Sequence, residues 1–132
     1  MQHYIKKVVA LLFGTRRRVY PTLANAVQLT GTTTTWSFGS YVEVVPVSTI
    51  TSNFRILEIV VEAVSASIEC QIDIATGAAS SEVVIFTARF VGTCRIQVPC
   101  DTISANTRIS ARLANKGTTG RTADISIGFI TE

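Results

Sequence analysis

Histidine and cysteine, the side chains that most often do chemistry in enzymes and hold metal ions, are scarce in this chain of 132 residues. The single histidine is His3, so no histidine-containing catalytic triad forms without it and no histidine-rich metal site is possible. The nine acidic side chains are scattered along the chain, which disfavours a calcium loop. Glycine-rich nucleotide-binding motifs and hydrolase motifs are also missing. We therefore expect no enzymatic activity, no cofactor, no metal and no small-molecule substrate.

The three cysteines are Cys70, Cys94 and Cys100, and their spacing matches neither a zinc site nor a redox motif. An odd number of cysteines favours reduced, buried thiols in a reducing compartment. A disulfide between Cys94 and Cys100 across a short hairpin is the alternative.

Leucine and methionine are also rare, with six and one, which disfavours a helical bundle. Valine, isoleucine and threonine together make up 47 of the 132 residues. Such β-branched side chains suit a pleated, half-buried surface better than a helix. With only 16% charged residues, the composition also excludes a disordered chain.

The clearest strand pattern lies at 67–75, where apolar and polar side chains alternate. The longest apolar run, 54–64, also reads as a strand with both faces partly buried, an interpretation that leaves room for a bulge. A helix is the alternative there, but Val60 and Val61 argue against it. Similar short runs, separated by turn residues, occur at 26–30, 41–45, 82–90, 94–98, 107–113 and 122–130.

Short, evenly spaced strands of this kind predict an all-β fold, an eight-stranded antiparallel β-sandwich. A jelly roll has eight strands in two Greek keys, whereas immunoglobulin-like sandwiches have seven to nine. We favour the jelly roll, because Trp36 lacks the cysteine pairing of antibody-type domains.

Charge divides the chain into a predicted arm at 1–23 and a predicted sandwich domain at 24–132. Residues 1–18 hold five basic side chains and no acidic one. The remaining residues hold seven basic and nine acidic side chains, a net charge of −2. The basic character therefore belongs to the arm, and basic arms commonly contact phosphates, acidic proteins or anionic lipid.

Apolar residues of the arm fall on one face of a short amphipathic helix, which Gly14 would end. A secretory signal is the rival interpretation, but the apolar run at 8–13 is short, arginines follow it, and no cleavage site appears. We favour an arm, helical or extended, that docks on a neighbouring protein. A membrane-surface helix, a nucleic-acid tail and a helix packed on its own domain stay open as alternatives, but we expect no membrane partner. The predicted partner-binding residues are Ile5, Val8, Val9, Leu12, Phe13, Arg16, Arg17 and Arg18.

Two groups in the domain are candidate binding surfaces. Trp36, Phe38 and Tyr41 form an aromatic cluster near one turn. Core packing is the simplest explanation, and stacking of Trp36 and Tyr41 on a glycan is the alternative. Arg108 and Arg112 share one strand face, but no aromatic side chain is interleaved with them in the sequence. Nucleic acid is therefore an improbable partner.

From Trp36 to Ile130, the chain resembles small structural proteins of tailed bacteriophages. The resemblance is carried by GSYVEVVP at 39–46, the small-residue loop GAASSE at 77–82 and ISANTRISARLA at 103–114. It implies a β-sandwich that self-associates or docks on a capsid, neck or tail.

This resemblance leads to a functional expectation: a virion structural protein of the capsid-cementing (decoration) or head–tail neck type. It would assemble in the host cytoplasm as a homo-oligomer, a trimer or larger ring, on the major capsid protein or other virion proteins. The arm would clasp the capsid or a neighbouring subunit. A carbohydrate-binding β-sandwich module, an adhesin or a tail-associated domain, is the alternative expectation.

Overall fold

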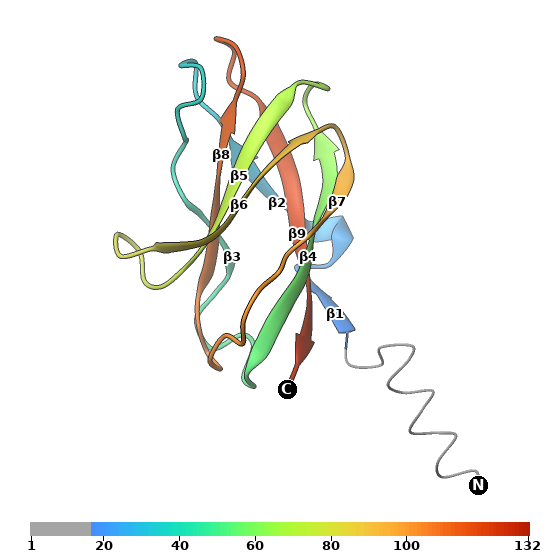
Figure 1. Ribbon diagram of the computed structural model, residues 1–132, viewed down its shortest axis with the longest axis vertical. Coiled ribbons are helices and arrows are strands. Elements are labelled where there is room, and N and C mark those ends of the chain that lie inside the picture. The colour runs from blue at the N-terminus through green and yellow to red at the C-terminus, as the bar shows by residue number, and fades with distance from the viewer. Residues whose placement is uncertain (1–16) are drawn as a thin grey trace, which may run out of the picture.

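The computed structural model describes residues 17–132, which form two antiparallel β-sheets packed face to face (Figure 1). The described elements are β1 (Arg17–Tyr20), the 3-10 helix η1 (Leu23–Asn25), β2 (Val27–Thr30), β3 (Val42–Val45), β4 (Phe54–Val64), β5 (Glu69–Thr76), β6 (Val83–Val91), β7 (Cys94–Gln97), β8 (Ile109–Asn115) and β9 (Thr122–Thr131). The described part contains no helix long and apolar enough to cross a membrane.

The strand order is that of a jelly roll. In sheet A the order is β1-β9-β4-β7, and β2 also pairs with β9; in sheet B it is β3-β8-β5-β6. Because β1 and β2 pair with successive parts of β9, they share the place of one strand. Counted in that way, the sandwich has the eight strands of two interleaved Greek keys. The predicted fold class is confirmed.

The sandwich begins earlier than the sequence suggested. We expected residues 1–23 to lie outside the domain, but all four residues of β1 pair with β9. Tyr20 packs against the core, which accounts for this placement. Pro21 and η1 then interrupt the edge before β2 resumes the pairing, as expected where proline removes a backbone donor. The other predicted arm residues, Ile5, Val8, Val9, Leu12, Phe13 and Arg16, lie outside the described residues.

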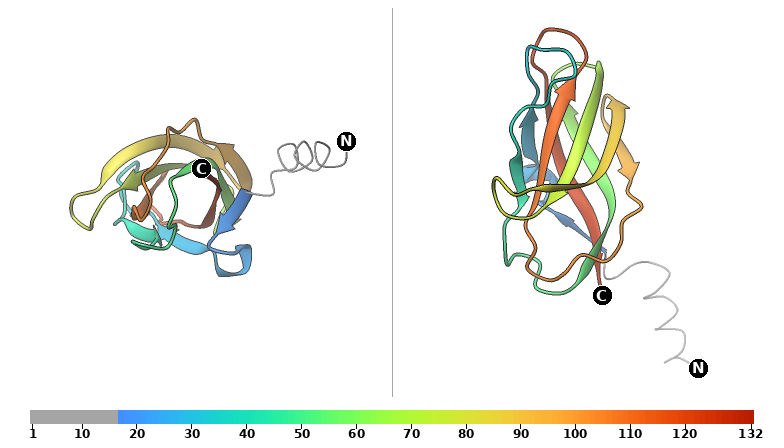
Figure 2. Two further views of the ribbon diagram at one scale, coloured as in Figure 1. Left: turned by 90° about the horizontal axis from the view of Figure 1, so that it is seen from below. Right: turned by 60° about the vertical axis from the view of Figure 1, so that its left-hand side comes forward.

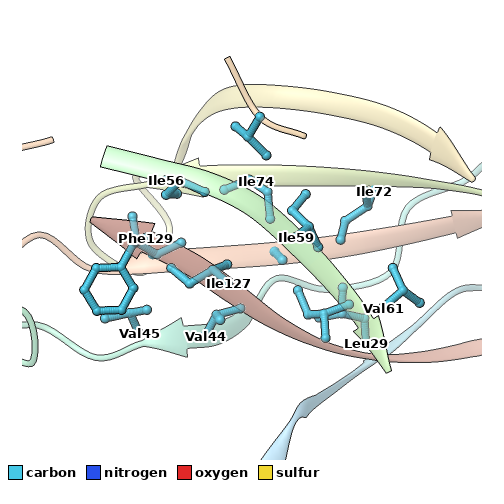
Figure 3. Packing of buried hydrophobic residues seen from close by; sticks show 14 of the residues in the cluster. Leu29, Val44, Val45, Ile56, Ile59, Val61, Ile72, Ile74, Ile127 and Phe129 are labelled. Atoms are coloured by element: carbon cyan, nitrogen blue, oxygen red, sulfur yellow. The ribbon is translucent and has the colours of Figure 1, made fainter. Parts of the chain in front are cut away.

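The core lies between the two sheets and is built from the inward-facing residues of both (Figure 3). Strand β5 contributes Ile72 and Ile74, which alternate with its outward-facing polar residues. Strands β4 and β9 meet there through the edge-to-face rings of Phe54 and Phe129, whose centroids are 5.9 Å apart. Because alternate residues of a strand face opposite sides, the period-2 pattern in the sequence locates this core.

Strand β4 is a strand along its whole length, as predicted, and not a helix. Its pairing with β9 shifts register between Ile56 and Glu58 and again between Val61 and Ala63. Each shift changes which face the following residues occupy. These two irregularities explain why the apolar residues of 54–64 do not alternate strictly in the sequence.

The connection between β2 and β3 runs beside β8 rather than away from the sandwich (Figure 2). The amide of Trp36 donates to the carbonyl oxygen of Asn115 at 3.0 Å, and the amide of Gly39 donates to that of Leu113 at 2.9 Å. Trp36 has a φ of 59°, a left-handed backbone conformation that is uncommon outside glycine. The connection therefore holds its aromatic side chains near the outer face of sheet B.

Candidate functional site

The outer face of sheet B carries the most organised group of polar and aromatic side chains in the described part of the chain. Three strands contribute to it, with Arg112 from β8, Asp73 from β5 and Arg89 from β6. The connection between β2 and β3 contributes the aromatic rings. We call this group the aromatic–arginine face; its members are Trp36, Phe38, Tyr41, Asp73, Arg89 and Arg112.

Arg112 is held by contacts with three neighbours. Its guanidinium carbon lies 4.3 Å from the ring centre of Phe38 and 4.6 Å from that of Tyr41. Its Nε donates to Oδ2 of Asp73 at 2.9 Å, and the hydroxyl of Thr87 donates to the other carboxylate oxygen at 2.7 Å. The Asp73 side chain is only 5% exposed. A buried carboxylate is tolerated when it is paired and hydrogen-bonded in this way.

Arg89 has a similar arrangement at the edge of the sheet. Its guanidinium carbon lies 4.3 Å from the ring centre of Trp36. Its Nε donates to Oε1 of Gln71 at 3.2 Å, and its Nη1 contacts Glu69 at 3.4 Å. A cation over an aromatic ring is favourable, the more so where water is partly excluded. The arginines of this face therefore attach the connection between β2 and β3 to sheet B.

The arginines on the outer face of sheet B are balanced by carboxylates of the same domain. Arg108, the residue before β8, donates from Nε to a carboxylate oxygen of Glu43 at 2.8 Å, so it is ion-paired like Arg89 and Arg112. Each of the three guanidinium groups has a carboxylate partner within the domain. Cations that are already paired offer little attraction to a polyanion. These three arginines therefore do not form a stripe of unpaired positive charge on this face.

The structure locates the aromatic cluster and corrects its environment. Trp36, Phe38 and Tyr41 are half-buried on the outside of sheet B, so packing in the central core is not their role. We found no aromatic residue interleaved with the arginines in the sequence, yet all three rings contact Arg89 or Arg112. The sequence could not reveal these contacts, because the rings and the arginines come from segments that are far apart in the chain.

A shallow polar cleft lies beside Tyr41. Its volume is about 520 Å³, and the β5–β6 loop forms its other wall. The residues that line it are Ser40, Tyr41, Ala79, Ser80, Glu82 and Arg108. Hydroxyl groups, a carboxylate, a guanidinium and one aromatic ring are present, but no set of nucleophile, base and orienting group is assembled there.

Glu58 forms a second charged group, on sheet A. It is ion-paired with Arg17 of β1 and, at 3.4 Å, with Arg95 of β7. It lies across Gly128 of β9, where a Cβ atom would come within 2.8 Å of the Glu58 side chain. Arg17, which we predicted to contact a partner, therefore has a partner within its own domain. Arg18 is exposed.

All three cysteines are free thiols, so the alternative disulfide between Cys94 and Cys100 is not formed. Cys70 is buried in the core, and Cys94 is partly buried. Burial raises the pKa of the Cys70 thiol, although the positive charge of Arg121 partly offsets this effect. Burial also raises the pKa of Cys94. Both thiols therefore stay protonated at neutral pH, as packing residues do.

No group of three potential metal-binding histidine, cysteine or acidic residues occurs within residues 17–132.

No family model matches the sequence. No curated protein matches it either. Among solved structures, the chain is similar to a carbohydrate-binding module, CBM36, in complex with calcium and xylotriose. The TM-score is 0.47 and the identity 13%, over 86% of this chain and 98% of that one. Because a fold hosts many functions, this similarity assigns no ligand.

Proposed function

We propose that this protein is a non-enzymatic virion structural protein that assembles as a symmetric oligomer. Its place would be on the capsid, as a cementing or decoration protein, or at the head–tail neck. Besides the resemblance of residues 36–130 to structural proteins of tailed bacteriophages, the jelly-roll topology supports the proposal, since this fold is common in viral capsid proteins as well as in lectins.

The observation that carries the proposal is how the arm joins the domain. Strand β1 pairs with β9 at all four of its positions, and Arg17 is ion-paired with Glu58. The segment before it in the sequence holds the apolar set from Ile5 to Phe13 and continues directly into this end strand of sheet A. Ordering such a segment is unfavourable unless something buries its apolar side chains. A segment with this amphipathic pattern, continuous in sequence with an edge strand, suits a clasp on a neighbouring virion subunit.

Binding to particles tests the proposal. Purified full-length protein is added to particles that were assembled without it, and the bound fraction is measured by co-sedimentation. We expect saturable binding, and at least a tenfold weaker affinity for the Leu12→Ser/Phe13→Ser variant. The control is Val47→Ser, at a position that is 65% exposed and far from the arm in the chain. Absence of binding by the unaltered protein would contradict the virion role. Equal binding by all three proteins would contradict the role of the arm.

Carbohydrate binding is the second candidate, and a specific observation favours it. Trp36, Phe38 and Tyr41 share one outer face, and a polar cleft adjoins Tyr41. Against it, a guanidinium group covers part of each ring. Trp36 is the single tryptophan of the chain, so tryptophan fluorescence, excited selectively over tyrosine, reports on this face alone. A saturable fluorescence change with neutral oligosaccharides, lost in Tyr41→Ala, would support this candidate over the virion role.

A further inference from the structure

Strand β6 presents the most exposed apolar surface in the described part of the chain. Within residues 17–132, six large apolar side chains are exposed, and four of these six belong to β6. They are Val83, Val84, Ile85 and Val91, with 63%, 40%, 38% and 58% of their surface accessible. Single exposed apolar residues are ordinary, but a group on one strand marks an interaction site.

The backbone of β6 also lacks a partner on one side among the strands that the structure describes, although the connection between β7 and β8 comes near it at Ile85. This nine-residue strand is the last strand of sheet B and is paired only with β5 among the described residues. At the usual rise per residue it extends over about 30 Å. An edge strand of this length offers a row of N–H and C=O groups to another strand.

The usual protection of an edge strand is weak in β6. The strand has no proline and no lysine, and its one charged residue is Arg89. The guanidinium of Arg89 is directed onto Trp36 and is ion-paired with Glu69, so it does not repel an approaching strand. A register shift near Val84, opposite Ile74 and Ala75, alters the pairing only at the start of the strand. Edges that must stay unpaired commonly carry charge or proline instead.

We propose that β6 pairs with β6 of a second copy of this chain, antiparallel, about a two-fold axis near Thr87. In this register Val83 of one copy lies opposite Val91 of the other, so the two most exposed large apolar side chains of the strand cover each other. Arg89 lies opposite Ile85 rather than opposite a second Arg89, so like charges do not meet. The two four-stranded sheets B join into one continuous sheet. The proposal rests on the symmetric assembly in the proposed function, and it names one of its contacts.

A second copy fits this edge better than the arm does. The edge has little net charge once Arg89 is paired with Glu69, so it offers little attraction to the basic segment at 1–16, whose basic side chains are Lys6, Lys7 and Arg16. A two-fold contact also requires a surface that complements itself, and reversing β6 about Thr87 gives that match. The axis stands perpendicular to the joined sheet, so the aromatic–arginine faces of both copies lie on the same side of it.

The experiment compares the self-association of the full-length protein with that of two variants, Val83→Lys and Val91→Lys. Sedimentation equilibrium over a range of concentrations gives the dissociation constant. We expect each variant to raise it at least tenfold, because lysine on an edge strand opposes pairing. The matched control, Val47→Lys, changes a similarly exposed valine outside β6 and should leave the constant unchanged. Circular dichroism and thermal unfolding establish that every variant is folded.

Hydrogen exchange provides an independent readout. Amides of β6 that face away from β5 should exchange more slowly as the concentration of unaltered protein rises, and this protection should be absent in Val91→Lys. An oligomer that the two lysine variants leave intact would overturn the β6 contact, as would an unaltered protein that is a monomer at every concentration. Particle binding is measured separately, so either result can be told apart from failure of the virion role. Weakened self-association with unchanged particle binding would support the β6 contact.

Discussion

Arg112 and Asp73 are joined across β8 and β5 by a 2.9 Å hydrogen bond on the outer face of sheet B. The bond lies beneath a cover of aromatic side chains, since the rings of Phe38 and Tyr41 both contact the same guanidinium. This ion pair therefore attaches the connection between β2 and β3 to the sheet. Its removal should affect the stability of the domain as well as the surface that the domain presents.

Replacing Arg112 with alanine should lower the free energy of unfolding by about 2 kcal/mol, because the carboxylate of Asp73 loses its cationic partner while staying buried. The value lies below that for a fully buried pair, since Arg112 is itself 31% exposed. Urea denaturation measures the change. Arg55→Ala is the control, because Arg55 is exposed on β4 and forms no ion pair within residues 17–132. Equal losses in the two variants would contradict the anchoring role.

Gly39→Ala should destabilise the domain by more than 3 kcal/mol or prevent folding, an effect on the order of the largest seen for single substitutions. A Cβ atom at this position would lie 2.0 Å from the carbonyl oxygen of Thr30, and backbone cannot move aside as a flexible side chain can. Gly120→Ala is the control, because its nearest contact is 3.4 Å. The midpoint of thermal unfolding should therefore be much lower for Gly39→Ala than for Gly120→Ala. Similar midpoints would show that Gly39 does not pack against the backbone of Thr30.

Ser110→Ala and Ser126→Ala should leave stability unchanged or raise it by about 1 kcal/mol. Both hydroxyl groups are buried and have no hydrogen-bond partner among the described residues, so removing them relieves an unsatisfied polar group. Ser65→Ala should instead cost about 1 kcal/mol, because the Ser65 hydroxyl accepts a hydrogen bond from the amide of Thr122 at 2.9 Å. Chemical denaturation of the three variants, compared side by side, checks the signs.

Thiol labelling should follow burial. Cys70 is 3% exposed and its pKa is raised, so iodoacetamide should modify it last and at a rate set by local opening. The pKa of Cys70 in the folded protein lies above that of an exposed thiol, so the folded state favours the protonated thiol. At neutral pH the thiol is protonated, and its full contribution to the free energy of unfolding is present. That contribution is lost as the pH rises through the folded-state pKa. Mass spectrometry of labelled peptides between pH 7 and about pH 10 measures the order; early modification of Cys70 at pH 7 would contradict the packing.

Local patterns predicted most of the fold, because one face of each core strand is buried. Strand β5 is the clearest example, with Ile72 and Ile74 inside and Asp73 outside. Strand β1 was missed because its two arginines read as part of the basic arm. In the structure Arg17 is paired with Glu58, a residue far along the chain. A charge pattern in the sequence shows which residues are basic but does not show where their acidic ion-pair partners lie.

The candidate surfaces were predicted less completely, for a related reason. The sequence placed Trp36 and Tyr41 together, because they are neighbours in the chain. It could not place Arg112 between Phe38 and Tyr41, since that contact depends on the path of the connection beside β8. Likewise, the alternation in β6 indicated a strand but not that the strand lies at a sheet edge. Tertiary pairing determines both features.

We propose that this protein is a component of a virion, and its amount in purified particles tests that proposal most directly. Particles from cells that carry the gene are purified on a density gradient and washed at high salt. Quantitative mass spectrometry then gives the ratio of this chain to the major capsid protein. The account predicts a fixed ratio, the same in every particle-containing fraction and in independent preparations. Absence of the chain, or trace amounts that vary between fractions and wash away, would contradict it.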